Sequence, residues 1–513
     1  MKEKMKAALF CRIPGLFFGL LMVAGTLIQA ETITSGYHFL DDHELLRIEY
    51  SLEMDKVPLG ELVLAWMKND LWWRFRPLYW VERVVGTAIM GSDMFYWNCY
   101  KAVMGVLTFH LLYMAARYLK AKWYTGVLFA GIIMMGAQFT PWYRSANQEN
   151  TGLFLCALSL YLIVRQYYKE KWGSPVYNIS IAVAAILCGL VKESFIFMMP
   201  AFAAIKFWLE YSQTCAARKE RGTLRRLLKR GVLCYIPVLA GFGFNVYYTL
   251  FQVGVDNVSY AGFHSDTSIR EYISGILYSV RTYLEWYLVF GIFCILIVLV
   301  CWQVIDLKKW KEYVGWAVIG FGIMAVQLVL HAESGMWERY IIPFIIGYAL
   351  VYVLLFDRML QKDAFRELVY TGILMALLFI GVREARSGAL QYADDGRLID
   401  GYLTYVVENT DEDSKIIGAF TDGELNLATS CWLEMNGRTK EFYYNWQSGE
   451  FSDNVQIVQV NQDTVSWADA DVVLCYSADV YTTIDMMGLT QEDVYERLQY
   501  GRYAVVVRGK EQG

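Results

Sequence analysis

Four consecutive ionisable residues, Asp41, Asp42, His43 and Glu44, form a dense group of side chains that could do chemistry. Two adjacent carboxylates repel each other when both are ionised, so one of them becomes the better proton acceptor. Asp41 or Asp42 is therefore a candidate general base, and His43 and Glu44 are candidates for orienting a substrate. The structural alternative is a helix capping box between Asp41 and Glu44.

Further polar residues stand at the ends of apolar stretches: Glu149, Lys192, Glu338, Arg339 and Tyr340. A phosphate group needs cations, and a hydroxyl nucleophile needs a carboxylate. Both kinds of side chain occur in this set, which indicates a site for a phosphate-bearing substrate. The alternative for each residue alone is an anchor that extends toward the lipid headgroups.

A further cation, Arg76, lies in the aromatic segment 71–80, which also contains Arg74. Aromatic rings mixed with arginines are typical of the layer between lipid headgroups and hydrocarbon. The segment therefore predicts an interfacial element, and Arg76 could also meet a phosphate.

The elements that must position these residues are hydrophobic helices. The 513-residue chain is 56% hydrophobic and only 19% charged, and a span needs about 20 apolar residues. We expect about eleven spans near residues 8–29, 95–118, 124–140, 152–168, 176–191, 195–210, 232–252, 286–305, 313–331, 341–357 and 368–383.

Basic residues predict the orientation of these spans. Alternation of the spans assigns six stretches to one side, and each is basic: the N-terminus, 120–122, 169–171, 218–230, 308–311 and 358–366. Because lysine and arginine collect in cytoplasmic loops, the N-terminus should be cytoplasmic. The loop 30–94 and the C-terminal tail should then lie outside the cell or plasma membrane.

The tail has a different composition from the rest, since acidic residues outnumber basic ones. Short β-like runs at 414–420, 470–475 and 503–507 alternate with helical patterns such as 491–499, which predicts a small α/β domain. A disulfide between Cys431 and Cys475 is a minor alternative to free thiols. The fold class is thus mainly α: a membrane domain over 1–384 and an acidic extracytoplasmic α/β domain over 385–513.

These features resemble the GT-C fold membrane glycosyltransferases, which include protein O-mannosyltransferases and aminoarabinose transferases. The first span is followed by a large outer loop that starts with Asp41 and Asp42. Lys192-Glu193-Ser194, the entry Glu338-Arg339-Tyr340 to a late span, and the C-terminal outer domain are similar as well.

The resemblance implies a hexosyl- or pentosyltransferase that moves a sugar from a polyprenyl-phosphate donor to an acceptor, with inversion. Asp41 or Asp42 would deprotonate the acceptor, Arg339 and Lys192 would stabilise the phosphate, and Tyr340 and Arg76 could assist. Glu149 and Glu338 would orient the substrate. The acceptor could be a lipid, a glycan or a protein.

Several alternatives remain open from the sequence. The chain could be a transporter or flippase of lipid-linked glycans, a polymerase of such units, or a membrane protein without catalysis. No metal or other cofactor is expected, because the outer loops of the membrane part contain no Asp-x-Asp pair and the chain has no Cys/His cluster. No nucleic-acid partner is expected either.

Overall fold

The structure is a computed structural model of the 513-residue chain. It describes residues 12–39, 41–145, 147–217, 223–254, 267–300, 309–333, 335–360, 364–438, 440–453, 465–489 and 494–508. Several predicted features fall outside these residues: the start of the first span, the N-terminal lysines, and parts of 218–230, 253–285 and 308–311.

The chain forms two compact units, and each is assembled from separate stretches of sequence. The first contains Met1–Ala30, Ala65–Trp80 and Cys99–Ala389, and the second contains Glu31–Leu64, Val81–Asn98 and Leu390–Gly513. The expected boundary at 384/385 lies inside one continuous helix, α19 (Ala364–Glu408).

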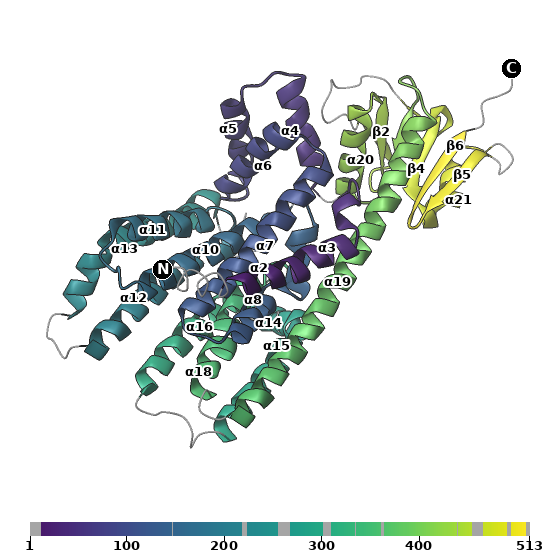
Figure 1. Ribbon diagram of the computed structural model, residues 1–513. Coiled ribbons are helices and arrows are strands. Elements are labelled where there is room, and N and C mark those ends of the chain that lie inside the picture. Colours follow the sequence, from purple (N-terminus) through teal and green to yellow (C-terminus); the bar gives the residue numbers. More distant parts are fainter. Residues whose placement is uncertain are drawn as a thin grey trace. The chain divides into compact units, whose positions relative to one another are not determined.

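The first unit is helical (Figure 1). Besides part of α19, its main helices are α2 (Ile13–Gly19), α3 (Gly25–Gln29), α7 (Met94–Tyr118), α8 (Trp123–Met134), α9 (Thr140–Tyr143), α10 (Glu149–Tyr168), α11 (Pro175–Gly189), α12 (Met198–Ala217), α13 (Thr223–Tyr247), α14 (Ile269–Tyr283), α15 (Glu285–Val300), α16 (Trp310–Leu330), α17 (Ile342–Ala349) and α18 (Phe356–Leu360). Helices α10, α11, α12 and α13 pack side by side (Figure 1).

Some of these helices are interrupted rather than straight. A π-helical segment, Leu20–Ala24, joins α2 to α3, and a second, Leu350–Leu355, joins α17 to α18. In the described chain, five helices are long and apolar enough to cross a membrane, or seven if each of two sharply bent pairs counts as one span. The chain is therefore a polytopic membrane protein, and the exact number of spans stays a prediction.

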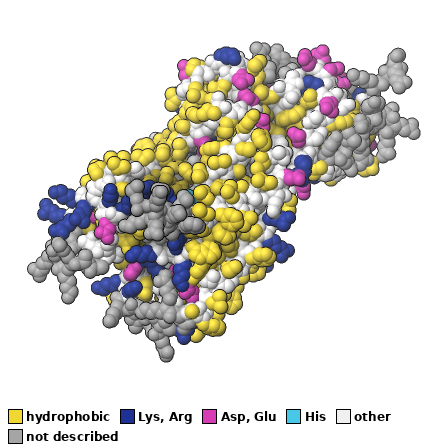
Figure 2. Space-filling model, in the orientation of Figure 1, with side chains coloured by type: hydrophobic (Ala, Val, Ile, Leu, Met, Phe, Trp, Pro, Cys, Tyr) yellow, Lys and Arg dark blue, Asp and Glu magenta, His cyan; other side chains and the backbone are white. Residues whose placement is uncertain are grey.

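Glycines allow close helix contacts in this unit. A Cβ atom on Gly320 of α16 would lie 2.4 Å from Val351 Cγ2, and one on Gly347 of α17 would lie 2.7 Å from the Gly320 carbonyl oxygen. Small residues at such crossings are typical of membrane helix packing. On the surface, hydrophobic side chains cover much of the helical unit, and lysines and arginines collect at one end (Figure 2).

The second unit is built on a six-stranded sheet with strand order β3-β2-β1-β4-β6-β5. The strands are β1 (Ile416–Gly418), β2 (Glu441–Asn445), β3 (Glu450–Asp453), β4 (Val472–Tyr476), β5 (Val494–Tyr500) and β6 (Tyr503–Arg508). The central β2-β1-β4 strands are parallel, and the outer ones pair antiparallel. The predicted α/β fold of the tail is confirmed.

Helices cover both faces of this sheet and bury two cores. One core includes residues of α4 (His43–Glu53), the end of α19 and α20 (Gly423–Met435), while the other includes α21 (Val480–Met486). The unit also contains parts of α5 (Leu59–Asp70) and α6 (Pro77–Met90).

One expectation for the tail is wrong. The helical pattern at 491–499 is a strand from Val494 onward, because β5 pairs with β6 and cross-strand hydrogen bonds override a local helical pattern. Cys431 and Cys475 are free thiols, as the sequence favoured, and the minor alternative of a disulfide between them is not formed. They belong to different cores, because Cys475 faces away from the side that α20 covers.

Candidate functional site

In the first unit, three charged residues from distant parts of the sequence meet. Glu149 begins α10, Lys192 follows α11, and Arg339 precedes α17. Lys192 Nζ lies 2.5 Å from Glu149 Oε1, and Arg339 Nε lies 3.4 Å from the same oxygen. We call Glu149, Lys192 and Arg339 the cation cluster.

The cation cluster carries a positive excess, since two cations share one carboxylate. Glu149 is 1% exposed and Lys192 is 3% exposed. Burial opposes the charged form of Glu149, but Lys192 and Arg339 outweigh it and lower the pKa of Glu149 to about 2. Its second oxygen, Oε2, accepts no hydrogen bond from the described residues.

Tyr340 forms an aromatic wall beside the cluster. Lys192 Nζ lies 4.3 Å from the centroid of its ring, and Arg339 donates a hydrogen bond of 3.3 Å to its hydroxyl. The ring of His331 stacks on that of Tyr340, with 5.2 Å between centroids. A tyrosine held in this way fixes both cations in position.

One further ion pair and a buried lysine lie near the cluster. Arg144 Nη1 lies 3.4 Å from Glu338 Oε1. Lys101, on α7, donates to the carbonyl oxygens of Arg144, at 3.0 Å, and Asn147, at 2.5 Å. This buried lysine therefore supports the segment that leads into Glu149.

The candidate phosphate ligand Arg76 also lies in the first unit. Its guanidinium pairs with both carboxylate oxygens of Asp70, at 2.8 and 3.0 Å, and lies over the ring of Tyr79. A bidentate pair of this kind occupies much of the donor capacity of an arginine. Arg76 would therefore have to exchange this partner in order to bind a phosphate.

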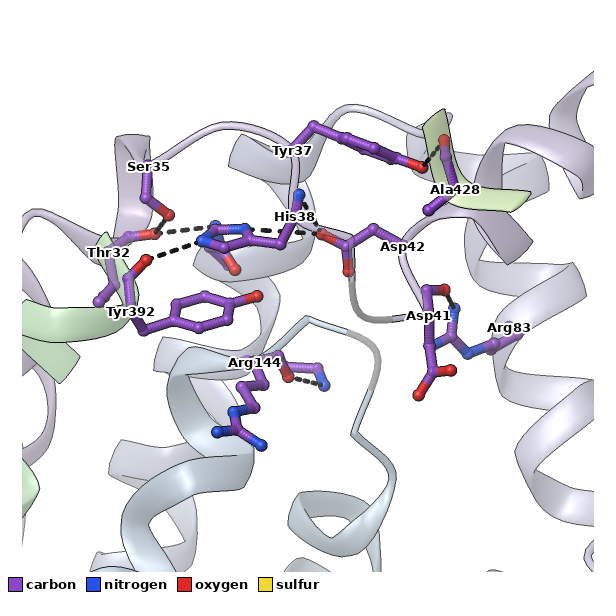
Figure 3. Close-up of polar contacts among 12 residues, drawn as sticks. Thr32, Ser35, Tyr37, His38, Asp41, Asp42, Arg83, Arg144, Tyr392 and Ala428 are labelled. Atoms are coloured by element: carbon purple, nitrogen blue, oxygen red, sulfur yellow. Dashed lines mark hydrogen bonds and ion pairs between the residues drawn. The ribbon is translucent and has the colours of Figure 1, made fainter. Parts of the chain in front are cut away.

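In the second unit, the two candidate bases have different surroundings (Figure 3). Asp42 is fully buried, and its Oδ2 accepts a hydrogen bond of 3.1 Å from the backbone N–H of His38. The Nδ1 atom of His38 lies 3.7 Å from the same oxygen, and its Nε2 donates to the carbonyl oxygen of Tyr392 at 3.0 Å. Asp42 is thus built into the interior.

Asp41 is partly exposed, and its backbone adopts the left-handed conformation with φ +62°. Arg83 holds this turn, because its Nη1 donates to the Asp41 carbonyl oxygen at 3.4 Å and its Nε lies 3.3 Å from Glu44 Oε2. The Asp41 carboxylate accepts no hydrogen bond from the described residues.

The capping box between Asp41 and Glu44 is wrong. Helix α4 begins at His43, so that Asp42 is the N-cap, and its side chain makes no capping bond. The Glu44 N–H instead donates to the Asp41 backbone carbonyl at 3.2 Å. The left-handed backbone of Asp41, together with Arg83, takes the place of the predicted cap.

His43 is buried at the start of α4. Burial lowers its pKa from 6.5 to about 4, and the Arg47 and Arg83 cations act in the same direction against the Asp41 carboxylate. The imidazole is therefore neutral at physiological pH, and its role in orienting a substrate stays a prediction.

Among the described residues, no three His, Cys, Asp or Glu side chains are placed to hold a metal ion. Metal independence stays a prediction. The sequence reasoning did not select Lys101 or Arg83 for the site. A lysine inside an apolar helix was the available signal for Lys101, whereas nothing in the local sequence marks Arg83.

Comparison with known proteins first gives a negative result at the level of sequence. No family model matches the chain, and no curated protein matches it.

At the level of structure, the chain has the GT-C fold, as the sequence resemblance predicted. The proteins that share it include the aminoarabinose transferase ArnT from Cupriavidus metallidurans, in a crystal structure bound to undecaprenyl phosphate. The TM-score is 0.50 with 13% sequence identity, over 96% of this chain and 98% of that one. The apo structure of ArnT gives a TM-score of 0.47 with 13% identity, over 95% and 97% of the two chains.

Proposed function

We propose that this protein is a membrane glycosyltransferase that moves a sugar from a polyprenyl-phosphate carrier to an acceptor hydroxyl outside the cytoplasm. The observation that carries the proposal is the cation cluster, with two cations held on one buried carboxylate. The shared fold with ArnT, which was crystallised with undecaprenyl phosphate, supports the same kind of donor.

The cation cluster suits a phosphate because of its net charge and rigidity. Glu149 neutralises only one of Lys192 and Arg339, so one positive charge remains for an anion. Cations fixed before the reaction stabilise charge that develops on a leaving group without rearranging, which is often the largest contribution to catalysis. Lys192 and Arg339 therefore act on the departing polyprenyl phosphate.

The general base in this proposal is Asp41. A base must reach the proton that it accepts. Asp41 is partly exposed, and its carboxylate has no hydrogen-bond partner among the described residues, whereas Asp42 is fully buried. Asp42 has a positioning role, because it ties the chain at His38 to the start of α4.

The reaction is an inverting substitution at the anomeric carbon. Asp41 takes the proton of the acceptor hydroxyl as the new oxygen–carbon bond forms. The bond between the anomeric carbon and the phosphate oxygen breaks at the same time. The electron pair leaves on the phosphate, where Lys192 and Arg339 balance its charge.

The test is sugar transfer by purified full-length protein in lipid nanodiscs, with polyprenyl-phosphate sugars as donors. Asp41→Asn should lower kcat at least ~100-fold, the size of a general-base contribution, and Asp42→Asn should lower stability as well as activity. Asp55→Asn, an exposed carboxylate in the same unit, is the matched control. Full activity of Asp41→Asn would remove this base, and substrate movement across the membrane without a new glycosidic bond would indicate a transporter.

A further inference from the structure

An apolar groove on the first unit, separate from the cation cluster, has the features of a lipid site. Its volume is about 510 Å³, and its walls come from α2, the π-helical segment Leu20–Ala24, α3, α8 and α19. The apolar lining includes Phe18, Leu21, Met22, Val127, Met375 and Leu378. None of Glu149, Lys192 and Arg339 lines it. We call this feature the α3–α19 groove.

The two ends of the groove differ in chemistry. At one end, Phe18 stacks on Trp123, and Tyr124 and Lys122 both bond to Glu367, near the start of α19. Farther along, Gly131 of α8 packs on Leu378 of α19, so these two helices run parallel. Arg386 and Gln29, which also line the groove, therefore lie at the opposite end.

Arg386 is exposed and makes no ion pair with a described residue, and Gln29 makes no hydrogen bond with one. An arginine in this position is unusual, because basic residues in membrane proteins collect on the cytoplasmic side, and this end is the predicted outer side. A partnerless cation at the end of an apolar groove complements a lipid with a negatively charged headgroup.

The groove also has the right extent for a lipid chain. Along α19, the distance from Thr371 to Arg386 corresponds to ~22 Å at 1.5 Å per residue, most of a hydrocarbon layer of ~30 Å. A volume of about 510 Å³ suits a single hydrocarbon chain rather than a bulky amphiphile. The π-helical segment lines the groove through Leu21 and Met22, and π-bulges are frequent at functional sites.

We infer that the α3–α19 groove binds an anionic phospholipid of the bilayer, with one acyl chain along the groove and the phosphate at Arg386 and Gln29. The donor phosphate has its own cations at the cation cluster, so this lipid is a second ligand rather than the sugar carrier. The site is independent of the proposed transfer reaction.

The experiment measures lipid retention by native mass spectrometry on the full-length protein in detergent. The probes are phosphatidylglycerol and phosphatidylcholine of matched acyl chains. The wild-type protein should bind phosphatidylglycerol about tenfold more tightly, equivalent to one charge-assisted contact. Arg386→Gln should abolish this preference. Arg383→Gln, on the same end of α19 but outside the groove, should retain it.

A second pair of variants tests the apolar wall. Met375→Trp fills the groove and should reduce retention of both phospholipids, whereas Phe379→Trp, an exposed position one turn along that does not line the groove, should not. Equal affinity for the two phospholipids in the wild type would overturn the inference. If Arg386→Gln still preferred phosphatidylglycerol, the inference would also be overturned. Displacement of the bound phospholipid by polyprenyl phosphate would overturn it as well.

Discussion

The charge state and the accessibility of single residues in this protein depend on the neighbouring groups rather than on the residue type alone. Glu149 and His43 are both buried, yet Glu149 keeps its charge because two cations lie against it, while burial, reinforced by the nearby Arg47 and Arg83, keeps His43 neutral. The same contrast separates Asp41 from Asp42, since only Asp41 presents a carboxylate to solvent.

The cation cluster leads to a prediction about charge balance. Glu149→Gln removes the carboxylate that the buried Lys192 and the half-buried Arg339 share, so it should destabilise the protein by roughly 3–5 kcal/mol, seen as a lower Tm. A polyprenyl-phosphate ligand should restore part of this Tm loss by supplying an anion. The conservative variant Glu149→Asp, which keeps the carboxylate, is the control. A Tm of Glu149→Gln equal to that of the wild type would contradict the cluster.

His43 leads to a prediction about pH. Its folded-state pKa of about 4 lies below the usual histidine value of 6.5, so between these two values the unfolded chain binds more protons than the folded one. The stability of the wild type should therefore fall as the pH drops from 6.5 toward 4. His43→Gln should lose less stability over this range in thermal unfolding. An identical pH profile for the two proteins would show that the imidazole is not kept neutral.

At the scale of elements, helix α14 supports the loop that leads to the cation cluster. Ser279 Oγ accepts a hydrogen bond of 2.7 Å from the Met336 N–H, and a Cβ atom on Gly275 would lie 2.0 Å from the Ala332 carbonyl oxygen. Helix α14 also has exposed apolar residues that recur every four positions: Ile269, Ile273 and Leu277. This is the pattern of a helix lying at the membrane surface.

Gly275→Val should therefore push the 332–336 loop away and displace Arg339. We expect kcat/KM for the donor to fall about tenfold or more, with kcat lowered as well, because Arg339 stabilises the charge that develops on the leaving phosphate. Gly322→Val on α16, where a Cβ atom meets nothing within 4 Å, is the matched control. Equal kinetics in the two variants would exclude this role for α14.

At the scale of the whole molecule, the arrangement of charges predicts the orientation of the chain in the membrane. Exposed basic residues such as Arg225, Arg226 and Lys309 should be cytoplasmic, whereas the sheet of the second unit should lie outside. The described native cysteines are buried or half-buried, so they give a low background for thiol labelling.

A membrane-impermeant maleimide tests this orientation in intact cells. Ser448→Cys, in the exposed β2–β3 turn, should be labelled without permeabilisation, and Lys309→Cys only after it. The reverse pattern would invert the topology and place the proposed base on the side where nucleotide sugars are available. That outcome would remove the reason for a lipid-linked donor.

The sequence by itself determined the membrane character and the types of residue that could do chemistry. Apolar stretches of span length and clustered basic residues are local features, because the cost of placing charge in hydrocarbon acts on each segment separately. The β-like runs of the tail were predictable for the same reason, since alternation and β-branched residues are visible over a few positions.

The tertiary structure alone decided which of these residues meet. Glu149, Lys192 and Arg339 are joined by helix packing across nearly two hundred residues, and no local pattern encodes such a contact. Likewise, only the fold buries Asp42 while leaving Asp41 accessible, and only pairing with β6 turns 494–499 into a strand. Burial and pairing are properties of the assembled chain, because they depend on partners that lie far away in sequence.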